Sequence, residues 1–595
     1  MAIRILAAAS AAALTLGASA DFITAAGART ARSLAGEWSY VVDPQETGFL
    51  DYRHQETPRG YFLDLPHDDP SLLFECDFDR SPRMRVPGAW NCQAPELLYY
   101  EGSVWLRTTF DAARRPGRRT VLRFGAVNYE AHVYLNGRKL GRHVGGFTPF
   151  DFDVTDLLRE GRNSLVVKAD SRRRRDGVPT DIFDWWNWGG VTGDVTLIDL
   201  PELYMADVYL QAAKGRLDLL EGEIELSERK AGERTAIEIP ELGVRAEAET
   251  GADGRARFAI PARPEPWSPE RPRLYRVAFV HGGERVEDDI GFRTVEAVGR
   301  ELRLNGRRVF LRGACLHDEA TGARGRVSTR AEAEELIARA KRLGCNFLRL
   351  AHYPHSEHTV RAAERAGIML WSEIPTYWTI DWTNPGTLEN ARAQLRDNIR
   401  RDRSRCNVII WSVANETPRS EARNAFLSEL VRTVRAADPN RLVSFAMELR
   451  GHDDRSISVG DDLADLVDVV SFNQYTGWYH PLKDAARISW VIPYEKPVIV
   501  SEFGGGAKLG LRGDESLRFS EDMQAAIYRE NLKMLGRIDG LAGLAPWILS
   551  DFRSPRRNQA GVQDGFNRKG LTDEHGREKL AFGVLRDYYG AMSRP

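Results

Sequence analysis

The sequence is poor in cysteine and in net charge, and no long apolar run follows its first twenty residues. Its 595 residues include five cysteines, and no CxxC or HxxxH spacing suggests a structural metal. The formal net charge of −2 gives no overall field that would attract nucleic acid or a membrane surface. We therefore expect no nucleic-acid partner, no membrane insertion and no metal or other cofactor.

The first twenty residues have the pattern of a targeting segment. Arg4 supplies a positive charge, residues 5–17 are apolar, and Ala-Ser-Ala at 18–20 fits a cleavage site. The apolar stretch is too short to span a bilayer. We expect a signal peptide over residues 1–20 and export to the periplasm or the medium after cleavage near Ala20. In such an oxidising compartment the pairing of Cys76 with Cys92 stays open.

The remaining chain is too long for one core and divides into three regions. Short strand-like runs and turn signals predict a jelly roll over residues 21–201 and a small immunoglobulin-like β-sandwich over 202–298. From residue 299 to 595 strands alternate with helical segments, which predicts eight strand–helix units and a (β/α)8 barrel. The expected barrel strands end near His317, His352, Glu373, Glu416, Met447, Tyr475, Glu502 and Trp547.

Two of these strands lead into a glutamate, whose carboxyl group can act as an acid, a base or a nucleophile. The runs 407–414 and 496–501 are rich in Val and Ile, as expected for parallel strands buried on both faces, and they lead into Glu416 and Glu502. Barrel enzymes place their chemistry at the carboxyl ends of the strands. Two carboxylates that face one pocket are the equipment of a glycoside hydrolase, and in retaining enzymes they lie about 5–5.5 Å apart.

Motifs along nearly all of the expected mature chain resemble those of glycoside hydrolase family 2, and within it the β-glucuronidases. The resemblance implies an exo-acting, retaining β-glycosidase that acts on carbohydrate without a cofactor. Family members are often dimers or tetramers, so whether this chain forms a homo-oligomer is left open. The motifs lie at residues 87–91, 146–151 and 184–190 in the first region, at 291–295 and 304–313 before the barrel, and at 352–354, 415–416 and 501–504 within it.

The resemblance also implies roles for single residues. Glu416 matches the acid/base, Glu502 the nucleophile, Asn415 a residue that binds the sugar 2-hydroxyl, and Tyr475 a phenol beside the nucleophile. Asp184 matches a first-domain residue that reaches the active site and binds a sugar hydroxyl. From their positions at strand ends we expect His317 and His352 to line the pocket, Trp547 to stack on the sugar, and Glu373 to be structural.

The identity of the sugar depends on Asn567 and Lys569. An Asn-x-Lys motif binds the C6 carboxylate in the β-glucuronidases of this family, but related β-galactosidases carry a similar run. The glucuronidases also place an arginine where this chain has Gln563, and loss of a guanidinium weakens carboxylate recognition. We expect β-D-glucuronide hydrolysis first and keep β-galactosidase as the alternative. The arginines that could replace the missing one lie in one loop: Arg553, Arg556 and Arg557.

Two segments of the first region have an unusual composition. Residues 172–175 are four arginines, which we interpret as a solvated loop, with a contact for a polyanionic substrate as the alternative. Residues 185–188 hold three tryptophans, which fit core packing or a sugar platform. The second option would allow a secreted carbohydrate-binding protein with an inactive barrel. The intact Glu416 and Glu502 argue against that hypothesis, because binding alone needs neither.

Overall fold

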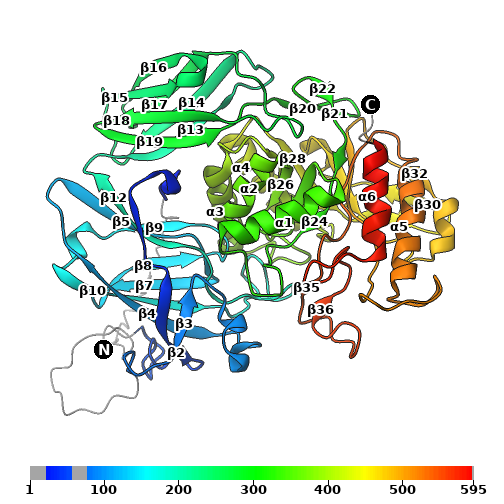
Figure 1. Ribbon diagram of the computed structural model, residues 1–595, viewed down its shortest axis with the longest axis horizontal. Coiled ribbons are helices and arrows are strands. Elements are labelled where there is room, and N and C mark those ends of the chain that lie inside the picture. Colours follow the sequence, from blue (N-terminus) through cyan, green and yellow to red (C-terminus); the bar gives the residue numbers. More distant parts are fainter. Residues whose placement is uncertain (1–21, 57–76, 593–595) are drawn as a thin grey trace, which may run out of the picture.

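The computed structural model describes residues 22–56 and 77–592 (Figure 1). The predicted signal peptide and Cys76 lie outside the described residues, so the cleavage and the pairing with Cys92 stay predictions. The described chain forms a jelly roll, a β-sandwich and a barrel in the predicted order. None of the described helices is long and apolar enough to cross a membrane.

The N-terminal domain packs two antiparallel sheets against each other. Residues on β10 alternate, so that Leu165 and Val167 enter the core between the sheets while Lys168 faces away from it. The six-stranded sheet has the order β3 (Arg83–Val86), β2 (Gly36–Asp43), β4 (Ser103–Ala112), β10 (Gly161–Asp170), β7 (Glu130–Leu135), β8 (Arg138–Val144). The four-stranded sheet has the order β1 (Ala31–Ser33), β12 (Val195–Pro201), β5 (Arg118–Phe124), β9 (Phe150–Asp153).

The second domain is a smaller sandwich with its own core. It contacts the barrel where Trp267 donates a hydrogen bond from its indole nitrogen to the carbonyl of Glu364 at 3.0 Å, and where Asp288 pairs with Arg361. One sheet has the order β13 (Met205–Ala212), β14 (Leu219–Leu226), β17 (Arg255–Pro261). The other has the order β16 (Val244–Glu249), β15 (Arg234–Ile239), β18 (Tyr275–His281), β19 (Glu284–Ile290).

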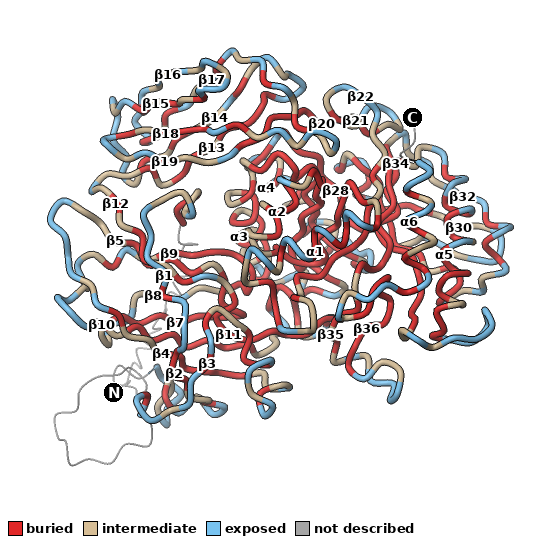
Figure 2. The backbone as a smooth tube through the Cα atoms, viewed as in Figure 1, coloured by how far each residue is buried: buried red, intermediate tan, exposed pale blue. Residues whose placement is uncertain are grey.

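The barrel is a closed ring of parallel strands that are buried along their length (Figure 2). Its first strand is split into β23 (Leu311–Arg312) and β24 (Cys315–Leu316), so nine segments form eight strands. Gly313 lies at the split, where a Cβ would approach the carbonyl oxygen of Leu544 to 2.8 Å, so a side chain has no room there. The others are β25 (Phe347–Leu350), β26 (Met369–Glu373), β27 (Val408–Asn415), β28 (Leu442–Met447), β31 (Val470–Asn473), β33 (Val498–Glu502) and β34 (Leu541–Leu544).

The helices outside the ring begin at polar caps, as at Thr329, whose side chain accepts a hydrogen bond from the amide of Glu332. The expectation of eight strand–helix units is wrong for the fifth and sixth units. The stretch 448–497, all of it described, contains no α-helix and instead holds β29 (Leu449–His452), β30 (Ser456–Val459) and β32 (Ser489–Val491) with short 3-10 turns. The helices are α1 (Arg330–Leu343), α2 (Glu357–Ala366), α3 (Pro385–Asp402), α4 (Glu421–Ala437), α5 (Glu521–Leu535) and α6 (Leu580–Met592).

A buried ion pair fixes the stretch that lacks helices. Arg423 at the start of α4 donates two hydrogen bonds, of 2.8 and 2.9 Å, to the carboxylate of Asp461 after β30. Both side chains are completely buried. Because the Asp461 carboxylate also accepts the amide of Leu463, it holds its own loop as well as the arginine.

We expect the Asp461→Asn substitution to destabilise the barrel by about 3–5 kcal/mol, because it leaves the buried Arg423 guanidinium without a counter-charge. Chemical denaturation followed by tryptophan fluorescence measures the loss. The matched control is Glu429→Gln, which breaks the solvent-exposed pair with Arg432 and should leave the midpoint almost unchanged. Equal midpoints for the two variants would show that the buried pair does not hold this stretch.

Candidate active site

Both predicted catalytic carboxylates lie at the carboxyl ends of the barrel strands. Glu502 is the last residue of β33 and is buried, whereas Glu416 follows β27 and is half-buried. Glu416 has a φ of 47°, a left-handed conformation that costs a residue with a side chain roughly 1–2 kcal/mol. Its amide donates to the carbonyl of Ala446 at 2.9 Å, which holds the turn in place. Strain of this kind is concentrated at functional sites.

Glu502 is held by two charge-stabilising donors. The guanidinium of Arg349 donates to one carboxylate oxygen at 2.8 Å, and the phenol of Tyr475 donates to the other at 2.6 Å. Burial raises the pKa of Glu502 to about 8, and the charge of Glu416 adds to the rise. Arg349 and Tyr475 oppose it because they bind the ionised form. The two donors therefore favour the state in which Glu502 can act as a nucleophile.

Arg349, in the middle of the mouth, connects four strands. Besides Glu502 it donates to both oxygens of Glu373, at 3.2 and 3.1 Å, and to the side-chain oxygen of Asn415 at 2.6 Å. Glu373 also contacts the Nδ1 of His352 at 2.7 Å. Despite its burial, the pKa of Glu373 is lowered to about 2, chiefly by the charge of Arg349. Glu373 is therefore the fixed counter-charge of Arg349.

Glu416 has neutral donors instead. The indole nitrogen of Trp378 donates to one of its oxygens at 2.9 Å, and the amide nitrogen of Asn473 donates to the other at 2.8 Å. Asn473 also donates to Asn415 at 3.2 Å and accepts from the hydroxyl of Ser501 at 2.8 Å. Among the described residues, Glu502 thus contacts an arginine and Glu416 contacts none. Different surroundings of this kind let two carboxyl groups take different roles.

Aromatic rings form one wall of the mouth. His352 stacks on Trp547, with ring centroids 4.9 Å apart, and His317 contacts the edge of the same ring at 5.3 Å. The Nε2 of His317 is buried and has no hydrogen-bond partner among the described residues, so it is available to a ligand. Trp185 of the jelly roll packs against both histidines and against Tyr377. The first domain therefore completes the wall of the barrel mouth.

Trp411, in the middle of β27, lies outside the barrel mouth. It is completely buried in the layer between strands and helices, and its indole nitrogen donates to Asp438 at 2.9 Å. Its side chain points out of the ring toward the end of α4, so it does not line the pocket.

Asp184 reaches the barrel, but its carboxylate already has protein partners. One oxygen accepts the hydroxyl of Ser554 at 2.6 Å, and the other pairs with Arg557. Both partners belong to the loop that follows β34. Asp184 therefore joins the jelly roll to this loop.

Asn567 and Lys569 line a cavity of about 200 Å³ beside Tyr475. The ammonium of Lys569 contacts the hydroxyl of Tyr479 at 3.3 Å and has no carboxylate partner among the described residues. Burial lowers its pKa. The cavity wall, as far as the chain is described, contains four cationic side chains and no acidic one; its residues are Trp478, Tyr479, Gly506, Arg518, Phe519, Arg557, Gln559, Gln563, Asn567, Arg568 and Lys569.

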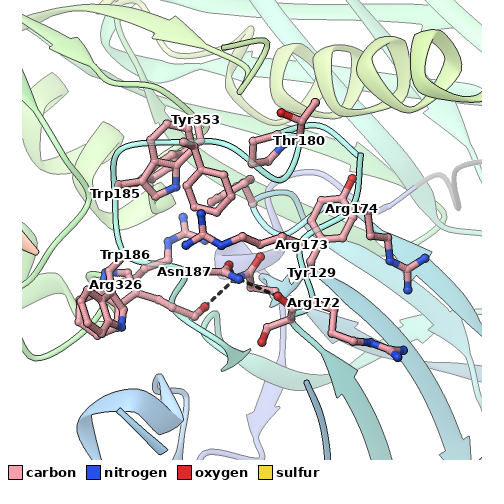
Figure 3. A pocket seen from close by; sticks show the side chains of 16 residues that line it. Tyr129, Arg172, Arg173, Arg174, Thr180, Trp185, Trp186, Asn187, Arg326 and Tyr353 are labelled. Carbon is pink, nitrogen blue, oxygen red and sulfur yellow. Dashed lines mark hydrogen bonds between the residues drawn. The ribbon is translucent and has the colours of Figure 1, made fainter. Parts of the chain in front are cut away.

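A second, much smaller cavity, of about 20 Å³, is lined by Trp185 and by the arginines at 172–174 (Figure 3). Arg173 pairs with Glu101, and Arg174 pairs with Glu130 and Asp170. The run is a loop, as expected, but Arg173 and Arg174 are half-buried and paired with carboxylates of the jelly roll rather than fully solvated. Arg175 is exposed.

Family models match both ends of this arrangement. The sugar binding domain of the glycosyl hydrolases family 2 matches residues 31–201, and the TIM barrel domain of the same family matches residues 295–565. The chain belongs to glycosyl hydrolase family 2. It is a glycoside hydrolase of the β-glycosidase type, which confirms the predicted family, fold class and enzyme class.

Relatives within family 2 are similar over almost their whole length. A β-glucuronidase from Paenibacillus borealis is 25% identical over 95% of this chain and 97% of its own, and one from Canis lupus familiaris is 27% identical over 95% and 91%. The structure of a β-glucuronidase from an uncultured Clostridium has a TM-score of 0.80 at 25% identity and covers 95% of this chain and 98% of its own. A β-galacturonidase from Eisenbergiella tayi, bound to galacturonate, has a TM-score of 0.78 at 24% identity, with 95% and 98% covered, and shares the fold.

Three residues of this family 2 site were not predicted from the sequence: Arg349, Trp378 and Asn473. A signal existed for Arg349, since a charged residue inside the apolar strand run 346–350 needs a buried partner. Trp378 lies in a loop and carried no such signal. Among the described residues no group of three or more His, Cys, Asp or Glu side chains could hold a metal ion.

We expect Tyr475→Phe to move the acidic limb of the pH profile of kcat/KM to higher pH. The substitution removes a donor that lowers the pKa of Glu502, so more of this carboxyl is protonated at a given pH. The rate at the optimum should fall about 10–100-fold, as for a lost hydrogen bond to a charged group.

The profile is measured with an aryl glycoside from pH 4 to 9. Tyr479→Phe is the control, because the Tyr479 hydroxyl contacts Lys569 rather than a catalytic carboxylate, and its acidic limb should stay in place. A Tyr475→Phe profile that is lowered evenly, without movement of the limb, would contradict the role of the phenol.

Proposed function

We propose that this glycoside hydrolase removes terminal β-linked uronic acids, β-D-glucuronides foremost, by an exo-acting double displacement with retention. The observation that carries the choice of sugar is the cavity beside Tyr475, whose described wall contains cations and amides but no carboxylate. A buried cation without a counter-charge is costly unless a ligand supplies one. The carboxylate of a uronic acid supplies it.

The cavity and the catalytic pair are adjacent. The ammonium of Lys569 lies 5.4 Å from the ring centroid of Tyr475, and the hydroxyl of the same tyrosine contacts Glu502. A single sugar ring in the mouth therefore has its acidic group toward Lys569 and its reacting carbon toward Glu502. This arrangement favours a uronide over β-galactosidase activity, since a neutral sugar leaves the Lys569 charge unpaired.

In the proposed mechanism Glu502 attacks the anomeric carbon while Glu416 protonates the departing oxygen, which breaks the bond to the aglycone. Arg349 and Tyr475 favour the ionised form of Glu502 and align it. Water then attacks the glycosyl-enzyme, Glu416 takes a proton from it, and Glu502 leaves as a carboxylate. Asn415, whose side-chain oxygen is held by Arg349, presents its amide nitrogen to the sugar 2-hydroxyl.

Exo action fits a mouth that the jelly roll narrows through Trp185 and Asp184.

We also propose export to the periplasm or the medium, on the residue pattern at 1–20. N-terminal sequencing of the mature protein tests this, with cleavage near Ala20 as the expected result and a retained Met1 as the contrary one.

The wild-type protein should hydrolyse 4-nitrophenyl β-D-glucuronide with a higher kcat/KM than the β-D-galactoside, with the β-D-galacturonide measured beside them. Lys569→Met should reduce the preference about 10–100-fold, because it removes a charge-assisted hydrogen bond to the sugar carboxylate. A wild-type preference for the galactoside would reject the uronide proposal and leave the catalytic pair intact. A preference for the galacturonide would keep the acidic sugar and change the stereochemistry at C4.

The stereochemical course and the two glutamates are tested together. Proton NMR of the first-formed product should show the β-anomer, and an α-anomer would rule out retention. Glu416→Gln should lower kcat by a factor on the order of 10²–10⁴ for a poor leaving group and by much less for an activated one, since only the poor leaving group needs a proton. Glu502→Gln should be inactive with both, and a Glu502→Gln enzyme that kept turnover would remove it as nucleophile.

A further inference from the structure

Arg557 is a cation of the cavity beside Tyr475 that also pairs with a residue of the jelly roll. It lies in the loop after β34, pairs with Asp184 of the jelly roll, and lines the cavity together with Asn567 and Lys569. We propose that Arg557, oriented by Asp184, binds the carboxylate of the substrate and determines specificity for uronides. The inference rests on the proposed function, because it assigns a residue to the recognition of the acidic sugar.

Charge balance is the first argument. Arg557 and Lys569 are two positive charges, and Asp184 is the one carboxylate that pairs with either of them among the described residues. For these two cations the sum is one unpaired positive charge, which a single carboxylate neutralises. Of the other cations in the wall, Arg568 is already paired with Asp551 and Glu574, and Arg518 is exposed to solvent and lies over Trp478. The two cations are close enough for the charge of Arg557 to lower the pKa of Lys569 further below the value set by burial. A shared anion removes this repulsion.

The geometry of the guanidinium is the second argument. One terminal nitrogen of Arg557 pairs with Asp184, while its Nε is buried and has no hydrogen-bond partner among the described residues. Since an arginine presents several donors in a fixed plane, holding one edge orients the rest. Asp184 in turn has both oxygens occupied, by Arg557 and by Ser554. Asp184 is therefore a positioning residue in this proposal rather than a direct contact for a sugar hydroxyl.

The structure separates Arg557 from the two other arginines that could replace the one absent at Gln563. Arg553 lies between the rings of Trp186 and Phe566, 5.5 and 4.6 Å from their centroids. Arg556 is exposed, and its guanidinium lies over Trp378 at 5.3 Å. Neither of them lines the cavity. Arg557 shares the cavity wall with Gln563 itself.

The test compares Arg557→Gln with Arg556→Gln, a matched loss of one charge from the neighbouring position of the same loop. We expect Arg557→Gln to reduce kcat/KM for the glucuronide about 10–100-fold, mostly through KM, and to weaken inhibition by free D-glucuronate to a similar extent. Activity toward the galactoside should change little. Arg556→Gln should leave the ratio of glucuronide to galactoside activity unchanged. A shift of the ratio in Arg556→Gln but not in Arg557→Gln would overturn the proposal.

A structural role for the pair gives a different result. If Arg557 and Asp184 only hold the two domains together, Arg557→Gln should reduce both activities equally and lower the melting temperature, which would overturn the proposal. Arg557→Lys, which keeps the charge, should retain part of the uronide preference. Asp184→Asn should raise KM for the glucuronide in the same direction as Arg557→Gln, and the double variant should lose less than the product of the two effects.

Failure of this inference is distinguishable from failure of the proposed function. A wild-type enzyme without preference for uronides would reject the proposed function itself. If Lys569→Met loses the preference and Arg557→Gln keeps it, the enzyme is specific for uronides and Arg557 is not the reason.

Discussion

The active site depends on one buried cation, the guanidinium of Arg349. A charge at this depth is tolerated only where carboxylates surround it, and Glu373 and Glu502 do so from two other strands. The same guanidinium fixes the oxygen of Asn415, so it orients residues at the ends of β26, β27 and β33 together. The need to neutralise this buried guanidinium thereby positions the groups that the reaction uses.

The two catalytic carboxylates differ because their surroundings differ. Glu502 has an arginine and a phenol as donors, and Glu416 has an indole and an amide. The two domains also contribute different parts of the site. The barrel provides the reacting groups, and the jelly roll brings Trp185 and Asp184 to the mouth. There Asp184 pairs with Arg557, which lines the cavity beside Tyr475.

Local patterns in the sequence predicted the features that are local in the structure. Apolar runs that lead into Glu416 and Glu502 mark strand ends, and the strand–helix period marks the barrel. The lack of α-helices between β28 and β33 was not predicted, because short apolar stretches there fit a strand or a helix equally well. Asp184 and Arg557 are 373 residues apart, so no spacing connects them, and their pairing follows only from how the domains pack. The contacts of Arg349 likewise could not be predicted from the sequence, because they form only where the barrel strands close into a ring.

Trapping the glycosyl-enzyme tests most directly whether this network makes Glu502 the nucleophile. The protein would be incubated with the 2-deoxy-2-fluoro glycosyl fluoride of the sugar that it hydrolyses fastest, digested, and analysed by mass spectrometry. The arrangement around Arg349 predicts a single labelled peptide with the sugar on Glu502. A label on Glu416, or steady turnover of the reagent with no covalent intermediate at any carboxylate, would contradict it.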